Sequence, residues 1–206
     1  MSSDTASIDG ITEGLATSLA DADLSPEVRA ALAAYQAEIE RLNRRVAEVE
    51  LLADRDALTP ALNRRAFVRE LQRTIAFCER YEAVASLVFF DLDSFKAVND
   101  TFGHAAGDAA LLWVAATLAD HVRESDVVGR LGGDEFAVIL AQASREAAET
   151  KAASLAEAIQ AQPVIFEGQS IPIRTSYGVR VFQRGLEAAA MLAEADAAMF
   201  LRKGRR

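Results

Sequence analysis

Apolar residues between positions 25 and 53 repeat in a heptad pattern. The segment opens on Ser25, Pro26 and Glu27, which supply a hydroxyl cap, a first-turn proline and an acid near the positive helix end. Apolar side chains then recur at alternating steps of four and three residues: Val28, Leu32, Tyr35, Ile39, Leu42, Val46 and Val49. This spacing predicts a helix that pairs with a second copy as a parallel two-stranded coiled coil. A single amphipathic helix packed on its own domain is the alternative.

Beyond residue 53 the pattern changes to short apolar runs between amphipathic stretches. Asn63 is placed to cap a helix, and Val84–Phe90 has the composition of a buried strand. A Gly-Gly turn joins two more apolar runs into a predicted hairpin, and Gly168 lies at the centre of another. The further elements expected are a helix from Asp108 to Val122, strands Val127–Leu131 and Phe136–Leu140, a helix over 144–160, strands Val164–Phe166 and Ile171–Val181, and a helix over 186–201. Together they predict an α/β fold with a mixed central sheet flanked by helices.

The chain is therefore expected to have three segments. Residues 1–24 are small and polar and are predicted to be flexible. Residues 25–53 are predicted to be a coiled-coil dimerisation helix, and residues 54–206 a single α/β domain.

Composition narrows the classes of function. A net charge of −9 argues against a nucleic-acid partner, because nucleic-acid binding needs a basic surface. The one cysteine, Cys78, cannot form an internal disulfide and is expected to be a packed thiol. No apolar run approaches the roughly 18 residues of a membrane span, and the N-terminus has no signal pattern. We expect a cytoplasmic protein with no membrane partner.

Acidic residues at the ends of two predicted strands are the first chemical clue. Asp91 follows the buried strand, and Asp134 and Glu135 follow the Gly-Gly turn of the hairpin. Taken singly, each could be an ordinary surface acid. If the hairpin lies beside the buried strand, however, Asp91 and Asp134 converge. Two carboxylates and backbone carbonyls form an oxygen-only site that suits magnesium and phosphate chemistry.

Polar residues lie between these acids in the sequence. Lys96 offers a charge for a phosphate, and Asn99 and Asp108 can hydrogen-bond the edges of guanine. His104 lies in the same stretch. The alternative is a polar loop that caps the next helix, with Asp108 as the cap.

Eight short motifs occur in order along the chain: Asp56–Thr59, Asn63–Arg65, Phe90–Asp100, Gly103–His104, Gly107–Asp108, Arg130–Phe136, Ser176–Val179 and Ala195–Lys203. The chain from about Asp56 to the C-terminus thus resembles the GGDEF-domain diguanylate cyclases. The resemblance implies a fold like that of nucleotidyl cyclases and polymerase palms. Two departures are visible: Pro60-Ala61 stands where the family usually has Gly-Leu, and Gly204-Arg205 follows Lys203 more closely than usual.

The resemblance implies a metal site and a reaction. Asp91, the Leu92 carbonyl and Asp134 would hold magnesium, with manganese as an alternative. Asp134, Glu135 and Lys96 would be catalytic, and two molecules of GTP would be joined into cyclic di-GMP. Residues expected to bind the substrate are Ser94, Phe95, Asn99, His104, Asp108, Gly132, Gly133 and Lys203.

The resemblance also implies a dimer and a second site. Each domain binds one GTP, so the family works as a homodimer, which the heptad helix would provide. Arg123 and Asp126 resemble an inhibitory site for the product, although the matching stretch around Ser154 offers no second arginine. An exposed salt bridge is the simpler interpretation of that pair. A non-catalytic nucleotide receptor and a coiled-coil interaction module are the competing functions.

Overall fold

A computed structural model describes residues 25–203, and within this range it describes all side chains except those of residues 46–53. The predicted flexible segment 1–24, the side chains of Val46 and Val49, and Arg205 therefore lie outside the described residues. The chain divides into two units between Leu51 and Leu52.

The heptad segment is a helix, α2, which spans Pro26–Asp54. The Val28 N–H donates to Ser25 Oγ at 3.3 Å, so Ser25 caps the helix as predicted. The apolar stripe is exposed at Val28, Tyr35, Ile39 and Leu42.

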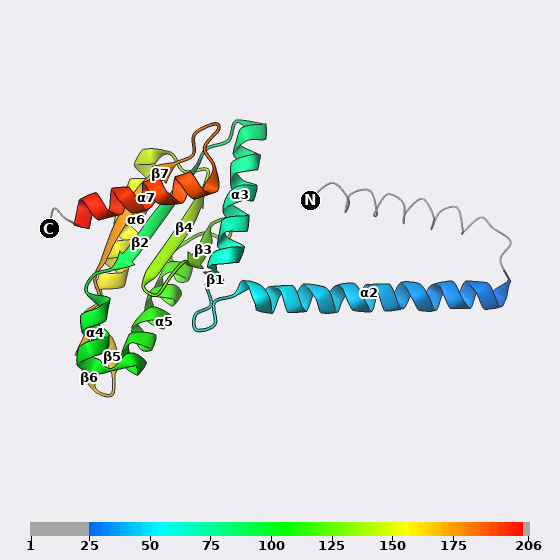
Figure 1. The fold of residues 1–206 in the computed structure, drawn as a ribbon, viewed down its shortest axis with the longest axis horizontal. Coiled ribbons are helices and arrows are strands. Elements are labelled where there is room, and N and C mark those ends of the chain that lie inside the picture. The colour runs from blue at the N-terminus through cyan, green and yellow to red at the C-terminus, as the bar shows by residue number, and fades with distance from the viewer. Residues whose placement is uncertain (1–24, 204–206) are drawn as a thin grey trace. The chain divides into compact units, whose positions relative to one another are not determined.

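The second unit is a three-layer α/β structure around a five-stranded sheet of order β1-β3-β4-β2-β7 (Figure 1). Its elements are β1 (Leu62–Asn63), α3 (Arg64–Tyr81), β2 (Ala85–Leu92), α4 (Phe95–Phe102), α5 (His104–Asp120), β3 (Val127–Arg130), β4 (Glu135–Ala141), α6 (Arg145–Gln160), β5 (Val164–Phe166), β6 (Gln169–Ile171), β7 (Thr175–Val181) and α7 (Ala188–Lys203). β1 pairs with β3 in parallel and the other neighbours pair antiparallel, so the predicted mixed sheet is confirmed.

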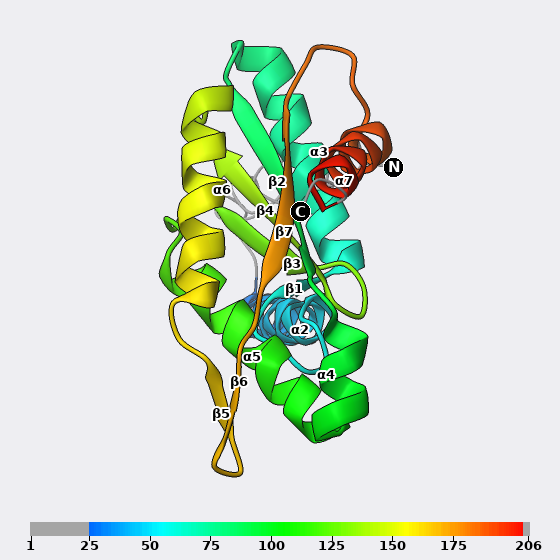
Figure 2. The same ribbon diagram turned by 90° about the vertical axis from the view of Figure 1, so that its left-hand side faces the viewer.

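Helices cover both faces of this sheet. Alternate residues of a strand point to opposite faces, so Val88 and Phe90 of β2 pack with α5 and α6. Leu87 and Phe89 pack on the other face with α3 and α7. Figure 2 views the sheet nearly edge-on, with α6 on one side and α3 and α7 on the other.

Two sequence predictions about this unit are wrong. Ile171–Val181 is not one strand: β6 ends at Ile171, before Pro172, and pairs only with β5, whereas β7 begins at Thr175 and joins the central sheet. Pro172 lacks the N–H that a continuous ladder needs. The helix expected to begin at Asp108 begins at His104, after Gly103 with φ 84°, so Asp108 lies inside α5 and does not cap it.

The cap predicted at the start of α3 is confirmed. Asn63 precedes α3 and its side chain accepts the Ala66 N–H at 3.0 Å.

The predicted packed thiol is also confirmed. Cys78 is buried in α3, and burial raises the pKa of its thiol.

None of the described helices combines the length and the apolar character needed to cross a bilayer.

Candidate active site

The ends of β2 and β4 bring the predicted carboxylates together. Asp91 lies opposite Glu135 in the β2–β4 ladder, and the Leu92 N–H donates to the Asp134 carbonyl at 3.2 Å. The hairpin therefore lies beside the buried strand, which was the condition for Asp91 and Asp134 to converge. Burial, and then the negative charge of Asp91, raise the pKa of Asp134. Two carboxylates, Asp91 and Asp134, therefore lie together at the adjoining ends of β2 and β4, which we call the Asp91–Asp134 corner.

The Gly-Gly turn beside these acids is shaped by Glu135 and Arg130. A Cβ at Gly132 would lie 2.5 Å from Glu135 Oε2, so a side chain there would displace the glutamate, whereas a Cβ at Gly133 would meet nothing within 4 Å. Arg130 donates from Nε and Nη2 to the Gly133 carbonyl at 3.2 and 2.7 Å. Arg130 thus fixes the backbone of the turn, while the space beside the Gly133 Cα stays open.

Arg130 also connects this turn to the segment that follows α2. Its Nη1 donates to Asp56 Oδ1 at 2.9 Å. The same oxygen accepts the Thr59 N–H at 2.9 Å and the Thr59 hydroxyl at 2.8 Å. Burial acts to raise the pKa of Asp56, but these bonds hold the pKa below its usual value. Both residues lie in family motifs of the sequence, but their pairing could not be predicted, because only the fold brings them together.

Glu135 faces a hollow between α3 and α7. This hollow has a volume of about 360 Å³ and is lined in part by Arg64 and Asp196. Burial, and then the charges of Asp196 and Asp134, raise the pKa of Glu135. Arg64 Nη1 donates to the Leu131 carbonyl at 3.2 Å and also lies close enough to offset part of that charge.

Lys203 reaches the site from the end of α7. Its ammonium donates to Asp91 Oδ1 and lies 3.9 Å from Asp93 Oδ1. Burial acts to lower the pKa of Lys203, but the bond to Asp91 and the charge of Asp93 raise it overall. Lys203 is therefore a cation beside the carboxylates, as a phosphate-binding role requires.

Close packing fixes the end of α7 that carries Lys203. The neighbouring Arg202 stacks on Tyr177 with its guanidinium 4.3 Å from the ring centre and pairs with Glu149 at 2.9 Å. A Cβ at Gly178 would lie 2.1 Å from the Ala195 carbonyl, so a glycine is needed where α7 crosses β7.

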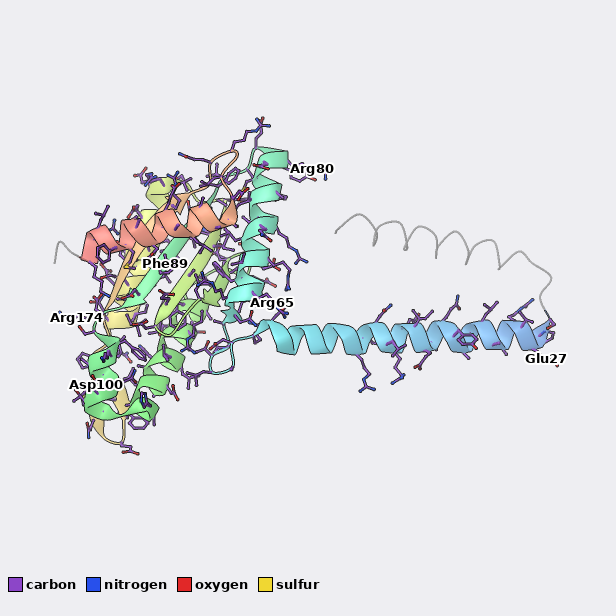
Figure 3. The ribbon with its side chains drawn as sticks, viewed as in Figure 1. Glu27, Arg65, Arg80, Phe89, Asp100 and Arg174 are labelled. Atoms are coloured by element: carbon purple, nitrogen blue, oxygen red, sulfur yellow. The ribbon has the colours of Figure 1, made fainter. Side chains whose placement is uncertain are left out.

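The predicted guanine-binding residues Asn99 and Asp108 lie on consecutive helices, Asn99 on α4 and Asp108 on α5. A Cβ at Gly107 would lie 1.9 Å from Asn99 Oδ1, so the Asn99 side chain lies directly over Gly107, next to Asp108. Ser94, with φ 58°, forms the turn from β2 into α4 and places Phe95 at the first position of α4. Figure 3 labels Asp100 on α4 and Arg174 at the end of the sheet where α4 begins.

Three of the predicted substrate residues have exposed side chains. These are Lys96, His104 and Asp108. They lie on α4 and α5 and are available to a ligand.

The oxygen donors of Asp91, Leu92 and Asp134 fit a divalent cation that would also bind oxygens of the substrate. Within the described side chains, no three acidic, histidine or cysteine residues gather closely enough to hold an ion by themselves. Asp91 and Asp134 repel each other, and a cation between them would relieve that repulsion. The remaining ligands would be the Leu92 carbonyl and oxygens of a substrate phosphate, which suits Mg²⁺.

The Arg123–Asp126 pair lies at a separate hollow of about 570 Å³. Asp126 accepts the Arg123 N–H at 3.0 Å and the Ala141 N–H at 3.1 Å, so it also holds the backbone. The described lining residues include Lys151 and Ser154 but no second arginine. Lys151 donates to the His121 carbonyl.

Comparison with known proteins gives the family. The family model "Diguanylate cyclase, GGDEF domain" matches residues 53–206. The chain is 38% identical over 152 residues to the probable diguanylate cyclase DgcE of Escherichia coli K12, covering 73% of this chain and 14% of that protein. It is 35% identical over 153 residues to diguanylate cyclase TpbB of Pseudomonas aeruginosa, covering 73% and 35%. The chain thus spans about a third or less of the length of these relatives.

A solved structure is similar over more of the chain. The coiled coil and GGDEF domain of DgcB from Caulobacter crescentus, in complex with c-di-GMP, has a TM-score of 0.77 and 29% identity. It covers 86% of this chain and 95% of the DgcB chain. The family match over residues 53–206 shows that the chain belongs to the GGDEF-domain family of diguanylate cyclases.

Proposed function

We propose that this chain is a diguanylate cyclase that joins two GTP molecules into cyclic di-GMP and releases two pyrophosphates. The observation that carries the proposal is the convergence of Asp91 and Asp134 beside an open glycine turn, with Lys203 at hand. Family membership and named cyclase relatives support it.

The reaction is an in-line displacement at the α-phosphate. A ribose 3′-oxygen forms the new bond to phosphorus, the bond to the bridging oxygen of pyrophosphate breaks, and Asp134 takes the hydroxyl proton. Glu135 supports the site from behind Gly132. A cation held by Asp91, the Leu92 carbonyl and Asp134, Mg²⁺ or Mn²⁺, would neutralise charge on the phosphates. Catalysis then rests on positioning and electrostatics.

The substrate contacts follow from the arrangement of α4, α5 and α7. Asn99 and Asp108 bind the guanine edges at the α4–α5 corner, and His104 lies at the start of α5. Lys96, Lys203 and the backbone at Ser94 and Phe95 bind the phosphates. Gly132 and Gly133 let the nucleotide approach the turn closely.

Cyclisation needs two such sites, so the active form is a homodimer. The exposed apolar stripe of α2, with Tyr35 71% and Ile39 56% exposed, supports pairing with a second copy. The likeness to a DgcB structure that includes a coiled coil agrees with this arrangement. In this proposal residues 25–53 are the dimerisation helix and residues 54–206 the catalytic domain, and a linked dimer raises the effective concentration of the two halves. A cytoplasmic location is part of the same proposal.

The Arg123–Asp126 hollow is proposed as an inhibitory site for cyclic di-GMP. Arg123 offers a fork of donors to phosphate and to a guanine edge. The volume of about 570 Å³ and the nearby Lys151 support a large, doubly anionic ligand.

The proposal is tested by product analysis. The purified chain is incubated with GTP and Mg²⁺, and nucleotides are separated by chromatography. Cyclic di-GMP with two pyrophosphates per product supports the enzyme. Binding of GTP or cyclic di-GMP without turnover would indicate a receptor, and neither binding nor turnover would leave an interaction module.

A further inference from the structure

Two buried hydroxyl side chains of β7 lie against the end of β2. Thr175 and Ser176 are 0% and 1% exposed. The Thr175 hydroxyl donates to the Asp91 carbonyl at 2.9 Å, and the Ser176 hydroxyl donates to Asp93 Oδ1 at 2.7 Å. A buried hydroxyl is costly unless it is paired, so these bonds fix the segment that carries Asp91 and Asp93.

Asp93 is held at both its backbone and its side chain. Its N–H donates to the Arg174 carbonyl at 2.9 Å, and its carboxylate accepts the Ser176 hydroxyl. The same Oδ1 lies 3.9 Å from the Lys203 ammonium. The fixed carboxylate of Asp93 therefore lies near the ammonium group at the end of the flexible Lys203 side chain.

Lys203 needs such an anchor to occupy one place. The turn of α7 that carries it is fixed by Arg202, but a lysine side chain has several rotatable bonds and loses entropy when it is ordered. Asp91 also bonds the ammonium, but in the proposed reaction Asp91 is engaged by the metal. Asp93 has no metal role in that reaction and can keep its contact throughout.

We propose that Asp93, held by Ser176, is a positioning residue that keeps the Lys203 ammonium at the phosphate end of the site. Asp93 touches neither the substrate nor the reacting atoms and acts through Lys203. The inference rests on the proposed function, because GTP phosphates are the ligand that Lys203 then meets.

The test is a double-mutant cycle between Asp93→Asn and Lys203→Met. Binding of α,β-methylene GTP with Mg²⁺ is measured by calorimetry, and KM and kcat are measured with GTP. Asp93→Asn keeps an oxygen that can accept from Ser176 but removes the charge. We expect it to weaken analogue binding by about tenfold and to raise KM more than it lowers kcat. In the Lys203→Met background the same change should have no further effect.

Two controls separate positioning from damage to the fold. Asp120→Asn removes a charge from an exposed aspartate at the end of α5 and should change neither binding nor melting temperature. Ser176→Ala should weaken binding in the same direction as Asp93→Asn, and this effect should also vanish in the Lys203→Met background. A general loss of structure would persist there.

The outcomes distinguish this inference from the proposed function. An Asp93→Asn effect of equal size with and without Lys203, or no effect at all, overturns the positioning role while turnover stands. Coupling in analogue binding without formation of cyclic di-GMP supports the positioning role and overturns the cyclase reaction. Failure of the unaltered chain to bind the analogue overturns both.

Discussion

The Arg130 guanidinium pairs with the Asp56 carboxylate at 2.9 Å and at the same time holds the Gly133 carbonyl at 2.7 Å. Both side chains of the pair are mostly buried, with 14% and 19% exposure. One cation thus ties the segment that follows α2 to the turn before Asp134. A change in the path of that segment would therefore act through Arg130 on the Gly132–Gly133 turn.

Arg130→Lys should impair turnover even though it keeps the charge. A lysine ammonium is a single point and cannot reproduce the planar fork that serves Asp56 and Gly133 together. Arg130→Ala should lower the free energy of unfolding by about 1–3 kcal/mol and reduce kcat further. Steady-state kinetics and thermal unfolding measure both. Arg145→Ala, at the exposed start of α6, is the matched control, and full activity in Arg130→Lys would contradict the role.

Asp134→Asn should stabilise the metal-free protein at neutral pH. The pKa of Asp134 is raised in the folded chain, so folding favours the protonated form, and stability falls as pH rises from the unfolded pKa through the folded one. The variant removes a charge that burial and Asp91 oppose. Its melting temperature should exceed that of the unaltered chain at pH 7, with the gap closing below about pH 4. A lower melting temperature at pH 7 would show that the folded chain does not oppose ionisation of Asp134.

Arg123→Ala should abolish noncompetitive inhibition by cyclic di-GMP. The variant removes the guanidinium from the hollow but leaves Asp126 to accept the Ala141 N–H. Asp126→Ala is a poorer test because it also frees two backbone donors. Initial rates at increasing cyclic di-GMP give the result. Inhibition that survives in Arg123→Ala would place the product elsewhere.

Charged residues in the α2 stripe should make activity depend on protein concentration. Ile39→Glu with Leu42→Glu places like charges in the predicted seam and should yield a monomer. Specific activity should then fall at low concentration, measured alongside light scattering. Gln36→Glu, at an exposed position outside the stripe, should keep the dimer and its activity. Unchanged specific activity in a monomeric variant would refute the role of α2.

Features that depend on residues close together in the sequence could be predicted from it. The heptad helix and the Asn63 cap depend on neighbouring residues, so spacing was enough to find them. The convergence of Asp91 and Asp134 followed once the hairpin was placed beside the buried strand. Family motifs supplied the remaining candidate residues.

Contacts between distant segments could not be predicted in the same way. The Asp56–Arg130 and Asp93–Ser176 bonds join residues whose spacing carries no periodic signal, and only strand pairing brings them together. The break after Ile171 was also missed, because the apolar residues around Pro172 resembled one continuous strand.

The most direct test of the account is turnover by Asp134→Ala. We predict that cyclic di-GMP formation from GTP and Mg²⁺ falls by at least about a hundredfold, while the variant remains folded and dimeric. Asp120→Ala, at an exposed position of α5, should retain full activity. Cyclic di-GMP formation at an undiminished rate in Asp134→Ala would contradict the claim that the Asp91–Asp134 corner is the catalytic centre.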